Sequence, residues 1–170
     1  MSGFKGALKN GMTEYLVNLK AKLDGLSEAE LRWQATLDSN SILWLVWHMA
    51  RVEDGWINSS IAGGDSVWDS GGWTTRTGFD VEGSGYGQSA DDVRSMPDVA
   101  LAELIQYFDD VRAAGFSVID GLSDDDLNRT FIRGDRSVTW SWILGHMVVE
   151  EAQHLGQIAF IRGMIRGLDG

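Results

Sequence analysis

The chain has 170 residues, of which 44% are hydrophobic, and this length and content suit one domain with a sizeable core. Its formal net charge of −11 argues against nucleic acid as a partner, because proteins that grip a phosphate backbone concentrate Lys and Arg on one face. There is no cysteine, so disulfides are excluded, and any metal site must be built from His, Asp and Glu.

The beginning of the chain shows no apolar run typical of a signal peptide, and no uninterrupted stretch is long enough to span a bilayer. We therefore expect a cytoplasmic protein with no membrane partner.

The first predicted helix covers residues 4–23, where apolar residues recur at spacings of three and four. A Ser27…Glu30 capping box then indicates a short turn of helix. The second long helix is predicted over residues 42–56, after the candidate caps Ser39 and Asn40. On its helical wheel His48 shares the apolar face, so this helix carries a histidine on its predicted core side.

The helical periodicity disappears over residues 62–89, where Gly, Ser and Asp dominate and four aromatic residues are interleaved. A loop this long inside a compact domain is more often functional than idle, and its aromatic residues indicate that it packs onto the helices. The glycine-rich run at 83–87 is not read as a phosphate-binding loop, because it follows no strand, opens no immediate helix and has no lysine.

The third helix is predicted to start near Pro97 and to run to about Ile119. A short extended piece is expected within residues 128–136, and the last helix is expected over about 138–167. Residues 121–127 repeat the pattern of residues 25–31, and Trp44 precedes His48 by four residues as Trp142 precedes His146, which indicates two diverged helix-hairpin halves.

Four helices with two short connections and one long connection predict an all-α fold. We expect a four-helix bundle with a long Gly-rich connection between the second and third helices, forming a single domain over residues 1–170.

One face of the last helix carries His146, Glu150 and His154, because residues four apart on a helix lie one turn above each other. This stripe is expected to continue into apolar residues and to face the core: Ile143, Met147, Ile161, Met164 and Leu168. Buried ionisable groups need a partner or a metal. All 3 histidines fall on predicted core-facing positions, which favours a metal site over a merely hydrogen-bonded core.

The ligand set follows from the spacing. Glu150 and His154 are spaced to hold one ion from one helix, and His48 is the histidine elsewhere that can complete the set. Three protein ligands leave an open position, as in a catalytic zinc site.

Other metal and catalytic motifs fit less well. Residues 151–154 match the Glu-x-x-His element of di-iron bundles, but no histidine is left to supply the second motif that such a site needs. Neither a zincin His-Glu-x-x-His motif nor the strained elbow of a serine hydrolase is visible.

The remaining polar residues of the last helix have less definite roles. His146 is the candidate catalytic residue and would then act as a general base. Two other interpretations are favoured over this one: His146 orients a metal ligand, or it is packed in the core as the pseudo-symmetric partner of His48. Arg162 and Arg166 offset the helix dipole, and Arg162 is also the candidate for binding a cofactor. Gln153 and Gln157 are read as surface or supporting residues.

The residues around His48, at 43–53, together with His146, Glu150 and the run at 154–163, resemble the DinB-like superfamily of metal-binding four-helix bundles. The likeness spans essentially the whole chain. Glu150 in the middle position is similar to the His/Glu/His variant of the mycothiol-dependent maleylpyruvate isomerases and related thiol S-transferases. The resemblance implies that His48, Glu150 and His154 bind a divalent metal, zinc in the first place and nickel or iron as alternatives.

The same resemblance implies a low-molecular-weight thiol cosubstrate, mycothiol or bacillithiol. Bound metal lowers the pKa of the thiol, and the resulting thiolate attacks a small electrophile. The long loop is then expected to shape the pocket at the helix ends. The 170 residues do not include the extra C-terminal domain of the maleylpyruvate isomerases, so we expect a stand-alone S-transferase in detoxification or stress defence.

Two other functions stay open. One is a metal-dependent hydrolase that uses metal-bound water, and the other is a non-catalytic metal-binding or dimerisation bundle. The far side of the last helix is also apolar, which favours a homodimer. Its residues are Leu144, Val148, Leu155 and Ala159.

Overall fold

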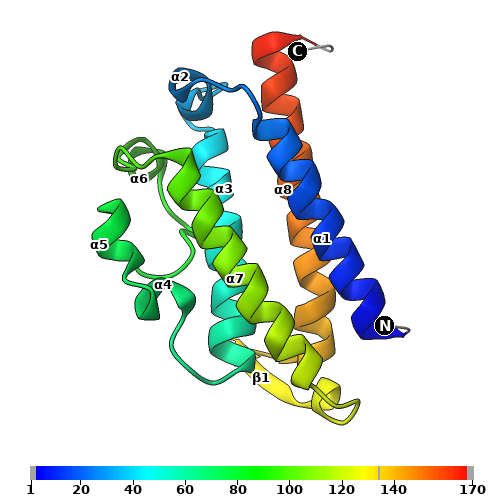
Figure 1. Cartoon of the computed structure of the whole chain (residues 1–170). Helices are drawn as coiled ribbons and strands as arrows, with labels where there is room; N and C mark the ends of the chain where they lie inside the picture. Colours follow the sequence, from blue (N-terminus) through cyan, green and yellow to red (C-terminus); the bar gives the residue numbers. More distant parts are fainter. Residues whose placement is uncertain (1–2, 134, 168–170) are drawn as a thin grey trace.

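The computed structural model describes residues 3–133 and 135–167, and these residues are mostly helical. The long helical segments lie side by side (Figure 1): α1 (Phe4–Leu23), α3 (Ile42–Glu53) continued by the π-helix η1 (Asp54–Ile61), α7 (Leu101–Gly121) and α8 (Trp140–Arg166). α1 packs against α8, and α3 contacts both α7 and α8. The two helices that carry the predicted metal ligands, α3 and α8, are therefore neighbours.

Hydroxyl caps fix where these helices begin. The Ser41 hydroxyl accepts a hydrogen bond from the backbone N–H of Trp44 at the start of α3, and Thr139 does the same for Trp142 at the start of α8. The predicted Ser27…Glu30 capping box is present and opens α2 (Glu28–Arg32). α8 thus starts at Trp140, two residues after the predicted start, because the Thr139 cap sets its first turn.

The second long helix differs from its prediction in length and in burial. Helical structure continues through η1 to Ile61 rather than ending at Trp56. Every residue of α3 is buried, so it has no solvent-facing side. The sequence indicated one apolar face, whereas α2, α7, α8 and the following segment together cover the helix all round.

The segment expected to be an irregular loop contains short helices: α4 (Val67–Ser70), α5 (Trp73–Thr77) and, just after it, α6 (Ala90–Arg94). Its aromatic residues pack down as expected at Trp68, Trp73 and Phe79, but Tyr86 is 86% exposed. α7 begins at Leu101 rather than near Pro97, because residues before it run irregularly and insert Met96 and Val99 into the core.

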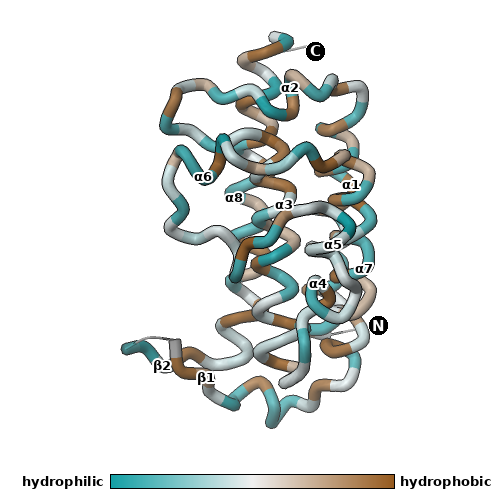
Figure 2. The backbone as a smooth tube through the Cα atoms, turned by 90° about the vertical axis from the view of Figure 1, so that its left-hand side faces the viewer, coloured by the Kyte–Doolittle hydropathy of each residue, from teal (hydrophilic) through white to brown (hydrophobic). Residues whose placement is uncertain are grey.

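The extended piece expected at 128–136 is an antiparallel hairpin of β1 (Thr130–Arg133) and β2 (Arg136–Thr139), which follows the 3-10 turn η2 (Asp126–Asn128). Figure 2 shows this hairpin at the end of the molecule opposite the C-terminal end of α8. Among the described residues, none belongs to a helix long and apolar enough to cross a membrane.

The core-facing side of α8 is rotated relative to the prediction. Glu151 is 1% exposed, Glu150 is only half-buried, and Met164 is 43% exposed although it was expected in the core. Leu168, which was expected on the same face, lies outside the described residues. Leu144 is fully buried, and the side chain of Val148 lies against Gly11 of α1. Part of the apolar face that favoured a partner subunit is therefore covered by α1 of the same chain.

Candidate metal centre

Three predicted ligands meet between α3 and α8. One ligand atom from each of His48, Glu150 and His154 lies within 4.8 Å of the others. Oε1 of Glu150 is 3.9 Å from Nε2 of His48 and 3.5 Å from Nε2 of His154. Ligand atoms of a tetrahedral zinc ion are about 3.3 Å apart, since each lies about 2 Å from the metal. These separations suit one ion after a small inward movement, and metal binding itself stays a prediction.

The hydrogen bonds of the two imidazoles orient them for ligation. His48 Nδ1 lies 2.6 Å from the backbone oxygen of Ser84, and His154 Nδ1 lies 2.9 Å from Oε1 of Gln157. Both partners are acceptors, so each Nδ1 carries the proton and donates it. The lone pair of each ring then sits on Nε2, the nitrogen that faces Glu150. Gln157, read from the sequence as a supporting residue, has a specific contact.

Burial favours the uncharged form of His48. Its side chain is 5% exposed, against 21% for Glu150 and 14% for His154. Burial lowers the pKa of His48 below its usual value, and the hydrogen bond to Ser84 opposes this shift. At neutral pH the ring is therefore in the neutral form that metals bind.

The residues from 83 to 88 hold His48 in place. The indole N–H of Trp44 donates to Oε1 of Gln88 at 2.8 Å, and the Trp44 ring stacks on His48 with centroids 4.7 Å apart. Gly85 has φ +82°, and a Cβ there would come within 2.7 Å of Trp47. Only glycine lets the loop lie this close to α3, and this path brings the Ser84 carbonyl to the imidazole.

A cavity of about 340 Å³ opens beside the three ligands. The loop forms one wall of this cavity, and Asn40, Trp44 and Gln153 contribute to the rest. The expectation that the loop helps to shape the pocket is therefore met. The cavity lies beside the middle of α8 rather than at the helix ends, because its ligands sit at mid-helix positions.

His146 lies one turn from Glu150, on the side away from His154. Its Nε2 is 3.7 Å from Oε2 of Glu150, and its side chain is 28% exposed. The ring stacks on Trp142 with centroids 4.6 Å apart, the geometry that Trp44 and His48 adopt in the other half. The structure places His146 beside the cluster but outside the ligand triad, and its catalytic role stays a prediction.

A buried charge cluster next to the site was missed by the sequence reading. Arg112 of α7 binds both carboxylate oxygens of Glu53, and it also donates to Glu151 and to the backbone oxygen of Met12. Both carboxylates are almost fully buried. Burial, followed by the charge of Glu53, raises the pKa of Glu151 to about 9, so Glu151 keeps its proton at neutral pH.

A signal for this cluster was present in the sequence. Glu53 follows His48 by five residues, as Glu151 follows His146, so the repeat of the two halves extends to these acids. Two equivalent carboxylates on neighbouring helices call for a shared cation, and Arg112 supplies it.

The predicted cofactor residue lies at the far end of α8. Arg162 donates to the backbone oxygens of Lys22 and Asp24 at 2.9 and 3.0 Å, and so holds the end of α1. It is eight residues from His154, about 12 Å along the helix axis. Its contact with a cofactor stays a prediction.

Comparison with known proteins adds two findings. The sequence profile of the mycothiol-S-transferase family matches residues 7–167. The crystal structure of a conserved protein from Enterococcus faecalis superimposes with a TM-score of 0.88 at 20% identity, covering 98% of this chain and 99% of that one. At this identity the likeness shows the fold alone. No curated protein matches the chain.

Proposed function

The chain belongs to the mycothiol-S-transferase family, a DinB-like family, and on that premise we propose that it is a metal-dependent transferase joining a low-molecular-weight thiol to small electrophiles. The observation that carries the proposal is the cluster of His48, Glu150 and His154 on the wall of a 340 Å³ cavity. We assign the long helices to a DinB-like four-helix bundle forming one domain over residues 1–170.

The donor set fits a divalent ion of the zinc class. It offers two imidazole nitrogens and one carboxylate oxygen, with no thiolate, and each imidazole is oriented by a hydrogen bond at its Nδ1. Zinc is the first choice, and nickel and iron are the alternatives because they accept the same ligand types. A metal bound here would lower the pKa of a coordinated thiol, which makes a thiolate available at neutral pH.

The side chains around the triad position it. Ser84 and Gln157 hold the two rings, and His146 is placed to hydrogen-bond the second oxygen of Glu150 after a small movement. We assign His146 to this positioning role, because its Nε2 faces Glu150 and its ring is stacked on Trp142. The thiol is mycothiol or bacillithiol, and we place the reaction in the cytoplasm, where small thiols are kept reduced.

The proposal is tested by metal content and thiol conjugation measured together. Wild type, His154→Ala and Glu150→Gln are purified in zinc-containing buffer, analysed by mass spectrometry for metal, and assayed with mycothiol and a fluorogenic electrophile. Gln153→Ala is the matched control, because Gln153 lines the cavity but is not in the triad. We expect the two ligand variants to lose metal and conjugation together, and the control to keep its metal.

Two results would reject the proposal. The first is a wild-type protein that binds no divalent metal at neutral pH. The second is conjugation that persists in His154→Ala. Turnover of esters or amides without added thiol would instead favour a hydrolase that uses metal-bound water in the same cavity.

A further inference from the structure

A cavity of about 370 Å³ adjoins the candidate metal centre, beside the C-terminal half of α8. Asn40 lines both this cavity and the one beside the metal ligands. Gln157, whose Oε1 lies 2.9 Å from Nδ1 of His154, also lines it. The two cavities are therefore continuous at these side chains, and the proposed ligand triad uses none of the other residues of the second one.

The cavity extends the metal centre along two antiparallel helices, α3 and α8 (Figure 1). On α3, Leu45 precedes His48 by three residues, which is about 4.5 Å along the axis. The α8 residues that share the face of His154 and line the cavity are Gln157, Ile161 and Met164. They lie about 5–15 Å from His154 along the axis. A small molecule that binds at the metal centre can therefore extend into the cavity.

The lining of the cavity along the helices is apolar. Leu45 is fully buried and Ile161 is 8% exposed, so these two side chains form the floor. Phe160 is 70% exposed and Met164 is 43% exposed, and they form the outer wall. Large apolar side chains left exposed around a cavity are typical of a binding site for an apolar group.

The volume of the cavity sets the size of that group. A cavity of about 150 Å³ lined by Leu, Ile and Phe is enough to bind benzene. At about 370 Å³ this cavity exceeds that size, although it is open to solvent along its outer wall. It has room for a ring or a chain of about six carbon atoms.

The polar residues of the cavity favour a neutral ligand. Asp38 lines the edge and forms no ion pair within the described residues, so this acid and the net charge of −11 repel a carboxylate. An ammonium group would lose its hydration against Leu45 and Ile161 without gaining hydrogen bonds there. The side-chain amide of Asn40 makes no hydrogen bond within the described part of the chain, so it is available to a carbonyl group that lies between the two cavities.

We propose that this cavity binds the apolar substituent of the electrophile, an inference that rests on the proposed function. The reactive carbon of the electrophile faces the ligand triad, while its chain or ring packs on Leu45, Ile161 and Phe160. The preferred substrates are then neutral electrophiles that carry an apolar group of about six carbon atoms. Each methylene group that leaves water for the cavity strengthens binding by up to about fourfold.

Binding is tested first without any thiol, with 1-hexanol as a neutral and unreactive probe in a saturation-transfer NMR titration. The proteins are wild type, a double variant that combines Phe160→Gln with Met164→Gln, and the control Val17→Gln. Val17 is an apolar residue of α1 that is 61% exposed and does not line the cavity. Glutamine has a high helix propensity, so the three substitutions keep the helices. We expect wild type and the control to bind alike, and the double variant to bind about tenfold more weakly.

Selectivity is tested second, with mycothiol and two N-alkylchloroacetamides that carry a methyl or a hexyl group on the same reactive head. The thiol sulfur forms a bond to the CH₂ carbon as the C–Cl bond breaks, chloride leaves, and the thiol proton passes to the buffer. We expect kcat/KM to be at least about tenfold higher for the hexyl compound in wild type and in Val17→Gln. In the double variant the same ratio should fall below about threefold.

Three results would overturn the proposal. They are no binding of hexanol by wild type, an equal hexyl-to-methyl ratio in wild type and the double variant, and a wild-type dimer that the double variant converts into a monomer. The third, measured by light scattering, would show that a second copy of the chain covers Phe160 and Met164. Conjugation at equal rates for both compounds would reject the apolar site and keep the transferase function. Hexanol binding without any conjugation would reject the transferase function and support the apolar site.

Discussion

Replacing Arg112 with methionine should destabilise the protein strongly. Arg112 is 5% exposed and is the cation that Glu53 and Glu151 share, and its remaining donor binds the backbone oxygen of Met12. Removing one partner of a buried ion pair costs about 3–5 kcal/mol, because the other charge stays buried without compensation. At low pH, protonation of the carboxylate that stays buried without its partner offsets part of this loss of stability. We therefore expect Arg112→Met to lose about 3–5 kcal/mol at pH 7 and less at pH 5.

The free energy of unfolding is measured by urea titration followed by circular dichroism, at both pH values. Arg129→Met is the matched control, because the Arg129 side chain is 62% exposed, its contact with Asp126 is 3.5 Å long, and its guanidinium lies 4.2 Å from the ring centroid of Trp140, a contact worth about 1 kcal/mol at an exposed site. Such a surface pair contributes about 1 kcal/mol or less. A loss for Arg112→Met no larger than that of the control would refute the assignment of Arg112 as the buried counter-ion of both acids.

Three further predictions concern the site and its surroundings. Gln157→Leu removes the acceptor that orients His154 and should weaken zinc affinity by about 10–100-fold in a competition titration. Unchanged zinc affinity would show that this hydrogen bond does not support metal binding. Gly85→Ala should reduce zinc affinity and stability more than Gly87→Ala. Both glycines have positive φ, but only at Gly85 would a Cβ collide with neighbouring side chains. Equal effects of the two substitutions would contradict this prediction. The pKa of Glu151 is raised to about 9, so the folded state keeps a proton that the unfolded state releases above its normal pKa of 4.5. The free energy of unfolding in urea should therefore fall as pH rises from 5 to 9. A Glu151→Gln variant that shows the same fall would disprove this prediction.

The ligand spacing was predictable because it depends on local helix geometry. Glu150 and His154 share a face through the four-residue period, and His48 was the histidine left on another long helix. The caps at Ser27 and Glu30 were equally local. These features need only the chain within a few residues of themselves.

Features that depend on packing between distant segments were not predictable in the same way. α8 is apolar on several sides, so the pattern did not decide whether Glu150 or Glu151 faced the core. Arg112 lies four residues after the buried Phe108 on the core face of α7, but its partners come from three other helices. The path of residues 83–88 depends on Trp44 and Trp47, nearly forty residues earlier in the chain.

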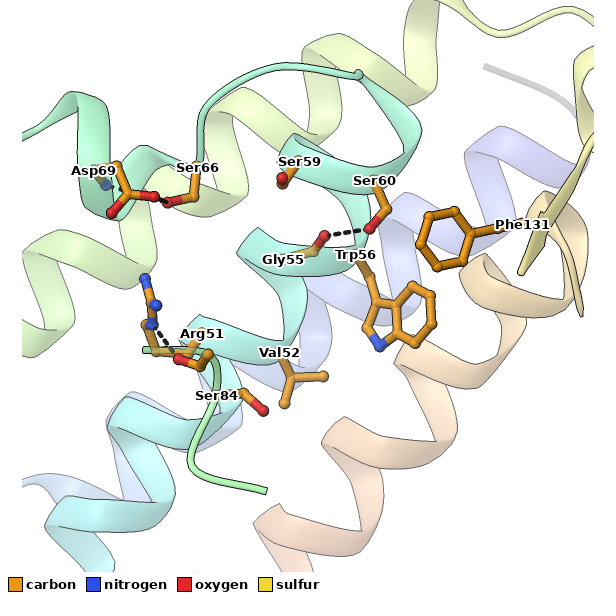
Figure 3. Close-up of a pocket in the computed structure, with 11 residues that line it drawn as sticks. Arg51, Val52, Gly55, Trp56, Ser59, Ser60, Ser66, Asp69, Ser84 and Phe131 are labelled. Atoms are coloured by element: carbon orange, nitrogen blue, oxygen red, sulfur yellow. Dashed lines mark hydrogen bonds between the residues drawn. The ribbon is translucent and has the colours of Figure 1, made fainter. Parts of the chain in front are cut away.

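Ser84 contacts the candidate metal centre and a separate cavity of about 380 Å³ through different atoms. Its backbone oxygen accepts a hydrogen bond from His48, and the residue also lines the separate cavity, together with Arg51 and Trp56 (Figure 3). Because every amino acid supplies the same backbone oxygen, substitution at this position can change the lining of that cavity while the imidazole keeps its tautomer. The lining of the cavity and the hydrogen bond that orients His48 can therefore be varied separately at one residue, provided that Gly85 keeps the loop on its course.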